Sequence, residues 1–144
     1  MNEGASTDQI VGAVKAPPEL LERPYLRPVY DEPEFIVRNV LRQFGGWWDG
    51  NPAHLKPARE RDLANELCTL AGGAGKLTTR ALELSGAGQH ALACHLIETA
   101  FASSACDGAT RAARATIYGA RAEAELSLMA KGVFGSAARE SLPE

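Results

Sequence analysis

Apolar positions in the first part of the chain recur at helical spacing only in short stretches separated by prolines. The first stretch covers residues 10–14, where Ser6 or Thr7 can cap a short helix that Pro17 then ends. A second stretch covers residues 18–21 and starts on a proline, which suits the first turn of a helix. The pattern therefore predicts two short helices near the N-terminus.

One longer helix is expected before residue 46. The prolines within residues 24–30 predict extended chain, because proline disfavours helix in the residue before it. Asp31 is expected to cap a helix with Pro33 in its first turn, and Gly45-Gly46 ends it. Its apolar residues form one stripe: Phe35, Ile36, Val37, Val40, Leu41 and Phe44.

The segment 46–52, Gly-Trp-Trp-Asp-Gly-Asn-Pro, combines turn-forming residues with both tryptophans of the chain. Two indole rings in a loop are unfavourable to leave in water, so we expect them to pack against another surface. Asp49 is the acidic residue for which a functional role stays open, since it lies between a tryptophan and a glycine in this loop.

Residues 60–140 are rich in alanine, contain no proline, and show a helical period. Helices are expected over 59–70, 77–84 and 89–103, and from Asp107 or Thr110 to Met129 or beyond. Glycines at 72–75 and 85–88 separate the first three. We predict an all-α fold in one domain, 1–144, with a proline- and tryptophan-rich irregular segment of short helices (1–58) before helical hairpins (59–140).

The helical half carries a partial tetratricopeptide pattern. Small and large apolar residues alternate as in one such unit at Ala81, Leu84, Ala93, Ile97 and Ala100. A shift by the repeat period of about 34 residues lands on Ala115 and Tyr118, but then on Ser127 in place of alanine. An ordinary helical hairpin and a repeat-like pair both explain this pattern.

Charge and cysteine content narrow the function classes. The net charge is −3 without a dense basic cluster, which argues against nucleic-acid binding. No apolar run reaches the roughly 18 residues needed to cross a bilayer, and the N-terminus lacks the features of a signal peptide. The three cysteines cannot all pair within the chain, which favours a reducing compartment. We therefore expect a cytoplasmic protein.

Catalytic and metal-binding patterns are not found in the sequence. His90 and His95 are five residues apart, whereas ligation from one helix needs a spacing of three or four. The glycine-rich segment 72–79 departs from a phosphate-binding loop because Leu77 follows Lys76 where a serine or threonine is required. No nucleophile, base and orienting group can be assembled. We predict no catalytic residue, no metal and no cofactor.

The tryptophan segment carries a resemblance to a known family. The strings concerned are Pro24-Tyr25-Leu26, Tyr30, Pro33-Glu34-Phe35, Val37-Arg38-Asn39 and Gly46–Pro52, with Leu55 and Pro57. Together they resemble the dimerisation domain of the metallo-β-lactamase-type alkyl sulfatases. The later segments 92–96 and 111–115 fit the helical hairpins of that domain, so the resemblance runs from about Gly4 to Ala138.

The resemblance implies a part of a larger enzyme. Such enzymes join a two-zinc catalytic domain, the helical dimerisation domain and a sterol-carrier-like domain, and their H-x-H-x-D-H zinc motif is not in this sequence. It implies a non-catalytic module that forms a homodimer, with a separate catalytic domain as a further partner. Candidate interface or domain-contact residues are Tyr30, Phe35, Val40, Leu41, Trp47, Trp48, Asp49 and Asn51. The alternative is a tetratricopeptide-like adaptor that binds a peptide or small apolar ligand.

Overall fold

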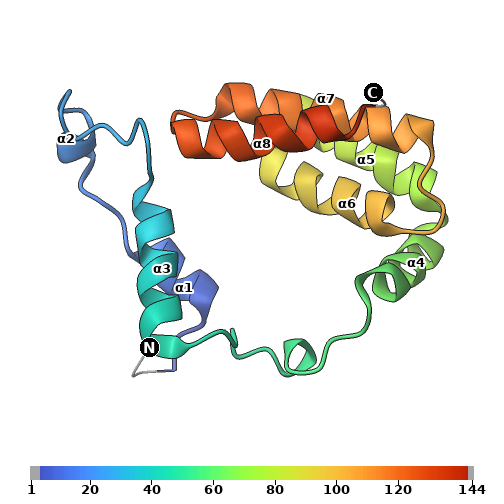
Figure 1. Ribbon diagram of the computed structural model, residues 1–144, viewed down its shortest axis with the longest axis horizontal. Helices are drawn as coiled ribbons and strands as arrows, with labels where there is room; N and C mark the ends of the chain where they lie inside the picture. Colours follow the sequence, from blue (N-terminus) through green and yellow to red (C-terminus); the bar gives the residue numbers. More distant parts are fainter. Residues whose placement is uncertain (1–3, 143–144) are drawn as a thin grey trace. The chain divides into compact units, whose positions relative to one another are not determined.

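A computed structural model describes residues 4–142, and within them the chain forms eight α-helices, one 3₁₀ turn and no strand (Figure 1). The all-α class predicted from the sequence is confirmed. The chain groups into two compact units. The first unit comprises residues 1–57 with 126–128, and the second comprises residues 58–125 with 129–144. That both units form one domain stays a prediction.

The first unit is built from short helices. They are α1 (Thr7–Ala13), α2 (Pro18–Leu21), α3 (Pro33–Gly45) and the 3₁₀ turn η1 (Pro52–His54). Ser6 caps α1, since its hydroxyl accepts from Gln9 N at 3.3 Å while the Gln9 side chain accepts from Ser6 N at 2.8 Å. Helix α1 packs against α3. The two predicted short helices are thus present.

Two local expectations about the first unit are wrong. Residues 23–27 form a turn in place of extended chain, because Leu26 N and Arg27 N both donate to the Arg23 carbonyl, at 2.9 and 3.1 Å. A proline is well suited to the second position of such a turn, since its ring fixes φ near −65°. The residue at the N-cap of α3 is Glu32, whose own N–H donates to the Asp31 carboxylate at 2.8 Å.

The second unit is a helical bundle. It contains α4 (Glu60–Ala71), α5 (Ala74–Gly86), α6 (His90–Ala102), α7 (Gly108–Ala124) and α8 (Leu128–Glu140, of which Leu128 belongs to the first unit). Helices α5, α6 and α7 pack against one another, and α4 packs against α5 and α6. Helix α8 lies along α7 (Figure 1), where the Tyr118 and Phe134 rings stack with centroids 5.9 Å apart.

Small residues make the core of this bundle. The buried cluster consists of Ala81, Leu84, Ala93, Ile97, Ala113, Ile117 and Tyr118. Alanine on facing helices lets the backbones approach closely, and a second cluster of Cys68, Ala74 and Ala100 fixes α4. Helical spacing places Leu63, Ala64, Leu67, Cys68 and Leu70 on one apolar face of α4, and this face is only partly covered. Ala64 and Cys68 are buried, but Leu63, Leu67 and Leu70 are exposed by 55%, 41% and 75%.

Two breaks between helices differ from expectation. The glycine-rich break is shorter than predicted, because only Gly72 and Gly73 have positive φ and α5 already begins at Ala74. The last predicted helix is two helices, since α7 ends at Ala124 and α8 begins at Leu128. Ser127 is fully buried and directly precedes α8, a position at which serine is favoured as a cap.

Candidate functional site

The first unit exposes its large apolar side chains. None of residues 4–57 is buried, and Tyr25, Tyr30, Phe44 and Trp47 are 69–76% exposed. Large exposed apolar patches mark interaction sites in folded proteins. The first unit therefore offers the candidate association surface of the chain.

Helix α3 carries apolar residues on two sides. Phe35, Val37 and Leu41 are half-buried, whereas Ile36, Val40 and Phe44 follow one another at four-residue spacing and are exposed. The single stripe expected from the sequence is thus divided into a covered side and an open side. We call the second of these, Ile36, Val40 and Phe44, the open stripe of α3.

Charges on α3 lie away from the open stripe. At 100° per residue, Glu34, Arg38 and Arg42 fall on the opposite side of the helix from Val40. Two of these charges pair with each other, since Arg38 donates to the Glu34 carboxylate at 2.8 Å. The open stripe is flanked by the neutral amides Asn39 and Gln43. A charge-free apolar centre is what protein interfaces favour.

The tryptophan loop after α3 is fixed by its own hydrogen bonds. The Trp48 indole donates to the Asn51 carbonyl at 2.9 Å, and Asn51 N donates to the Asp49 carboxylate at 3.0 Å. The Asn51 side chain in turn accepts from Ala53 N at 3.0 Å, and His54 contacts Asp49 at 2.6 Å. The Asn51 N–H and then His54 hold the pKa of Asp49 below its usual range. Asp49 thus has a structural role within the loop.

Four of the eight candidate residues from the sequence line one groove. Leu41, Trp47, Trp48 and Asp49 border a cavity of about 440 Å³ together with residues of α3 and Thr7. Asn51 is tied to this group by the bonds just described, whereas Phe35, Val40 and Tyr30 do not line the groove. Trp47 is 74% exposed, so most of this side chain is uncovered within the described chain. The interface or contact role of all eight stays a prediction.

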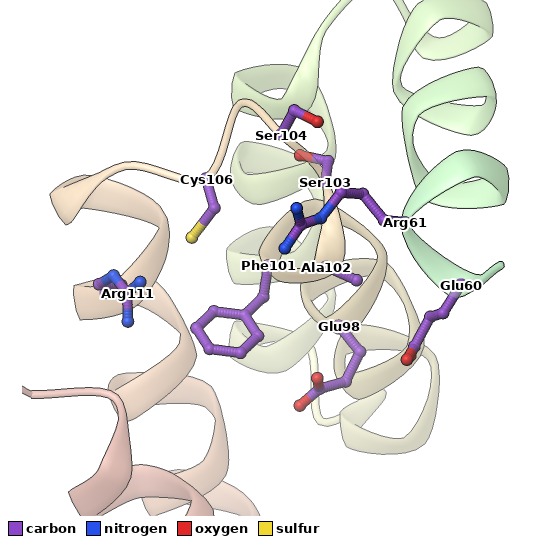
Figure 2. A pocket seen from close by; sticks show the side chains of 9 residues that line it. All are labelled: Glu60, Arg61, Glu98, Phe101, Ala102, Ser103, Ser104, Cys106 and Arg111. Carbon is purple, nitrogen blue, oxygen red and sulfur yellow. The ribbon is translucent and has the colours of Figure 1, made fainter.

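The second unit has a pocket of about 650 Å³ at the meeting point of α4, α6 and α7 (Figure 2). The Phe101 ring lies in its lining, with Arg61 reaching in from α4 and Arg111 bordering it on α7. The remaining lining residues are Glu60, Glu98, Ala102, Ser103, Ser104 and Cys106. Guanidinium and hydroxyl groups beside an aromatic ring can bind a polar ligand that carries negative charge.

A buried arginine beneath this pocket was missed by the sequence reasoning. Arg114 donates from Nε and from a terminal nitrogen to Glu98 at 2.8 Å each, and from its other terminal nitrogen to the Ala137 carbonyl and the Ser141 hydroxyl. Its guanidinium also lies 4.4 Å from the Phe101 ring centre and 5.0 Å from that of Tyr118. Glu98 and Arg114 are 16 residues apart, so no local spacing reveals the pair.

Burial shifts the pKa values of two titratable groups near Arg114, Tyr118 and Cys94. Burial, followed by the Glu98 carboxylate, raises the pKa of the Tyr118 phenol. Burial also raises the pKa of the Cys94 thiol, which keeps it protonated and unreactive. All three cysteines are free thiols.

Between residues 4 and 142 no three His, Cys, Asp or Glu side chains cluster as metal ligands. No helix in that range is long and apolar enough to span a membrane.

Comparison with known proteins identifies the family. The sequence profile described as "Alkyl sulfatase dimerisation" matches residues 6–143. The chain therefore belongs to the alkyl sulfatase dimerisation family, and the resemblance inferred from the tryptophan segment is confirmed.

Individual relatives are longer enzymes. A linear primary-alkylsulfatase of Pseudomonas sp. (strain ATCC 19151) is 37% identical over 78 residues, which are 54% of this chain and 15% of that protein. An (R)-specific secondary-alkylsulfatase of Pseudomonas sp. is 35% identical over 75 residues, 51% of this chain and 11% of that protein. The matched segments thus span less than a fifth of the length of these relatives.

Solved structures share the fold. The structure of a double mutant of the sec-alkyl sulfatase PisA1 gives a TM-score of 0.88 at 24% identity, covering 100% of this chain and 23% of that one. The stereoselective inverting sec-alkylsulfatase Pisa1 from Pseudomonas sp. gives 0.86 at 24% identity, with 99% and 23% covered. At this level of identity the likeness shows the fold alone.

Proposed function

We propose that this chain is a self-association module and forms a homodimer through the first unit. The observation that carries the proposal is the exposure of that unit: its largest apolar side chains are open to solvent, and none of residues 4–57 is buried. Membership of a dimerisation family supports a second copy of the chain as the partner. A two-fold interface uses the same patch on both copies, which a self-complementary apolar surface permits.

The exposed area suits an interface of ordinary size. Large aromatic side chains bury about 150–250 Å² each, so the four rings at 69–76% exposure present on the order of 500 Å². A standard interface takes about 800 Å² from each partner. Leu26, Ile36 and Val40 add further exposed apolar surface. The first unit therefore offers enough area for a specific interface.

The module is proposed to have no catalytic site of its own. This is supported by the family match, which is to a dimerisation domain. Sulfate-ester hydrolysis belongs to the named relatives, and a separate catalytic domain is the proposed further partner. Three free thiols support the proposed cytoplasmic location.

A charge placed in the open stripe tests the proposal. Phe44→Glu should shift the sedimentation of the protein from dimer to monomer, because the carboxylate would be buried without a partner. Phe44 is 73% exposed in the single chain, so the fold should tolerate the change. Leu92→Glu, at a 55% exposed position of α6 in the second unit, is the matched control and should leave the dimer intact. A Phe44→Glu protein that sediments like the control contradicts the proposed surface.

A further inference from the structure

We propose that the pocket of the second unit binds a side-chain carboxylate of an acidic peptide segment, with Arg61 and Arg111 as its charged donors. The pocket is independent of the proposed dimer surface, which lies in the first unit. Its volume of about 650 Å³ falls within the range of about 300–1,000 Å³ that is typical of ligand sites. The polar groups of its lining differ in whether they already have partners within the protein.

The two serines of the lining are engaged within the protein. The Ser103 hydroxyl donates to the Ala100 carbonyl at 2.8 Å and accepts from Ala105 N at 3.3 Å. The Ser104 hydroxyl accepts from Asn65 Nδ2 at 3.0 Å, while Ser104 N donates to Asn65 Oδ1 at 2.8 Å. These bonds fix the loop between α6 and α7, so the serines shape the pocket.

The Glu98 carboxylate is also matched. Both bonds from Arg114 reach one of its oxygens at 2.8 Å, and the arginine side chain is only 11% exposed. The pair is therefore close to neutral as seen from the pocket. The charges that remain in the lining are two guanidiniums and the carboxylate of Glu60, which gives an excess of one positive charge.

Arg61 and Arg111 have no carboxylate within 4.0 Å in the described part of the chain. Arg111 lies over the Phe101 ring with its guanidinium carbon 5.3 Å from the ring centre. An arginine stacked on a ring is held in place while its N–H edges stay free, and that fork matches the two oxygens of a carboxylate. Figure 2 shows the Arg61 side chain reaching into the same pocket.

The lining of the pocket favours a glutamate side chain as the group that supplies the carboxylate. The lining places an apolar ring next to the two arginines, so the pocket suits a carboxylate carried on a short aliphatic stem. A glutamate side chain has such an aliphatic stem and ends in a carboxylate. A positively charged segment should be rejected, because it would face two guanidiniums.

Charge variants at the pocket test the proposal by fluorescence anisotropy with a labelled tetraglutamate peptide at low salt. Arg111→Gln should weaken peptide binding about fivefold, the effect of losing one partly exposed charged pair. Glu60→Gln should strengthen it by a similar factor, because it removes the like charge from the lining. Arg80→Gln is the matched control: it removes the same charge from an exposed Arg80–Glu83 pair of α5 and should change nothing.

The opposite signs of the two pocket variants make the test decisive. A purely structural effect of the substitutions would not strengthen binding in Glu60→Gln, and circular dichroism checks that each variant is folded. The proposal is overturned by a tetraglutamate affinity that Arg111→Gln and Arg80→Gln lower equally. It is also overturned by wild-type protein that binds labelled tetralysine as well as tetraglutamate.

Discussion

Replacing Arg114 by methionine should destabilise the second unit more than any surface substitution of the same charge. Methionine keeps much of the side-chain volume but removes every donor. The Glu98 carboxylate loses both of its 2.8 Å bonds, and the Ser141 hydroxyl loses the one from Arg114. The Phe101 and Tyr118 rings lose the guanidinium, which lies 4.4 Å from the centre of the first ring and 5.0 Å from the centre of the second.

The size of the effect follows from burial. Removing one partner of a fully buried ion pair costs about 3–5 kcal/mol, because an uncompensated charge stays inside the protein. The Glu98 side chain is 36% exposed, so water replaces part of the lost interaction and we expect about 2–3 kcal/mol. For a unit of this size that corresponds to a melting temperature lower by roughly 10–20 °C.

Urea unfolding followed by circular dichroism measures this loss. The control is Arg80→Met, which removes an arginine from a pair whose side chains are 59% and 57% exposed and should cost less than about 1 kcal/mol. A double-mutant cycle with Glu98→Gln isolates the contribution of the pair. An Arg114→Met variant as stable as the Arg80→Met control would refute the reasoning that the buried Arg114–Glu98 pair stabilises the second unit.

Four further substitutions probe the fold. Ile97→Ala removes a fully buried side chain from the alanine-rich core and should lower the free energy of unfolding by about 3 kcal/mol in urea titrations. Gly72→Ala forces a side chain onto a φ of 81° and should cost about 1 kcal/mol, whereas Gly75→Ala within α5 should stabilise slightly. Asp107 caps α7 by accepting from Thr110 N at 2.8 Å, and this bond holds the pKa of its carboxyl below the usual range. Its contribution is therefore present at neutral pH and lost as pH falls through that lowered pKa, so Asp107→Asn should flatten the acid limb of the stability profile.

Each of these expectations has a clear contrary result. An Ile97→Ala protein within about 1 kcal/mol of the wild type would mean that the core readily closes around the cavity. Equal stability of Gly72→Ala and Gly75→Ala would argue against a left-handed end of α4. An unchanged acid limb in Asp107→Asn would show that another carboxyl dominates the pH dependence.

The sequence predicted the helices best where local signals are strong. Ser6 with Gln9 and the glycine pair after α3 are signals that act within a few residues, and the helices begin and end there. The break between α7 and α8 carries neither glycine nor proline. At this break Ser127 is buried and α8 packs against the core. Both features depend on tertiary contacts, which a local sequence pattern does not reveal.

Burial was harder to predict than helix position. Helical spacing assigns Leu63, Leu67 and Leu70 to an apolar face, but the bundle buries the smaller Ala64 and Cys68. Periodicity identifies an apolar side of a helix without saying what covers it. The same limit applies to α3, whose single predicted stripe is covered on one side and open on the other.

The candidate residues were found through the family resemblance and the unusual tryptophan loop. Their grouping was only partly foreseeable: Asp49 binds within its own loop because Asn51 and His54 follow at short spacing. The pocket beside Phe101 is lined by residues from three helices, so no short sequence motif indicates it. Sequence alone therefore indicated the candidate surface of the first unit and missed the polar pocket of the second.

The mass of the protein in solution tests self-association most directly. Light scattering on the wild-type chain across a dilution series should give a concentration-stable mass of twice the 15.3 kDa of one chain. That result would support a homodimer held by the exposed surface of the first unit. A mass of one chain at every concentration would contradict self-association as the activity of this module.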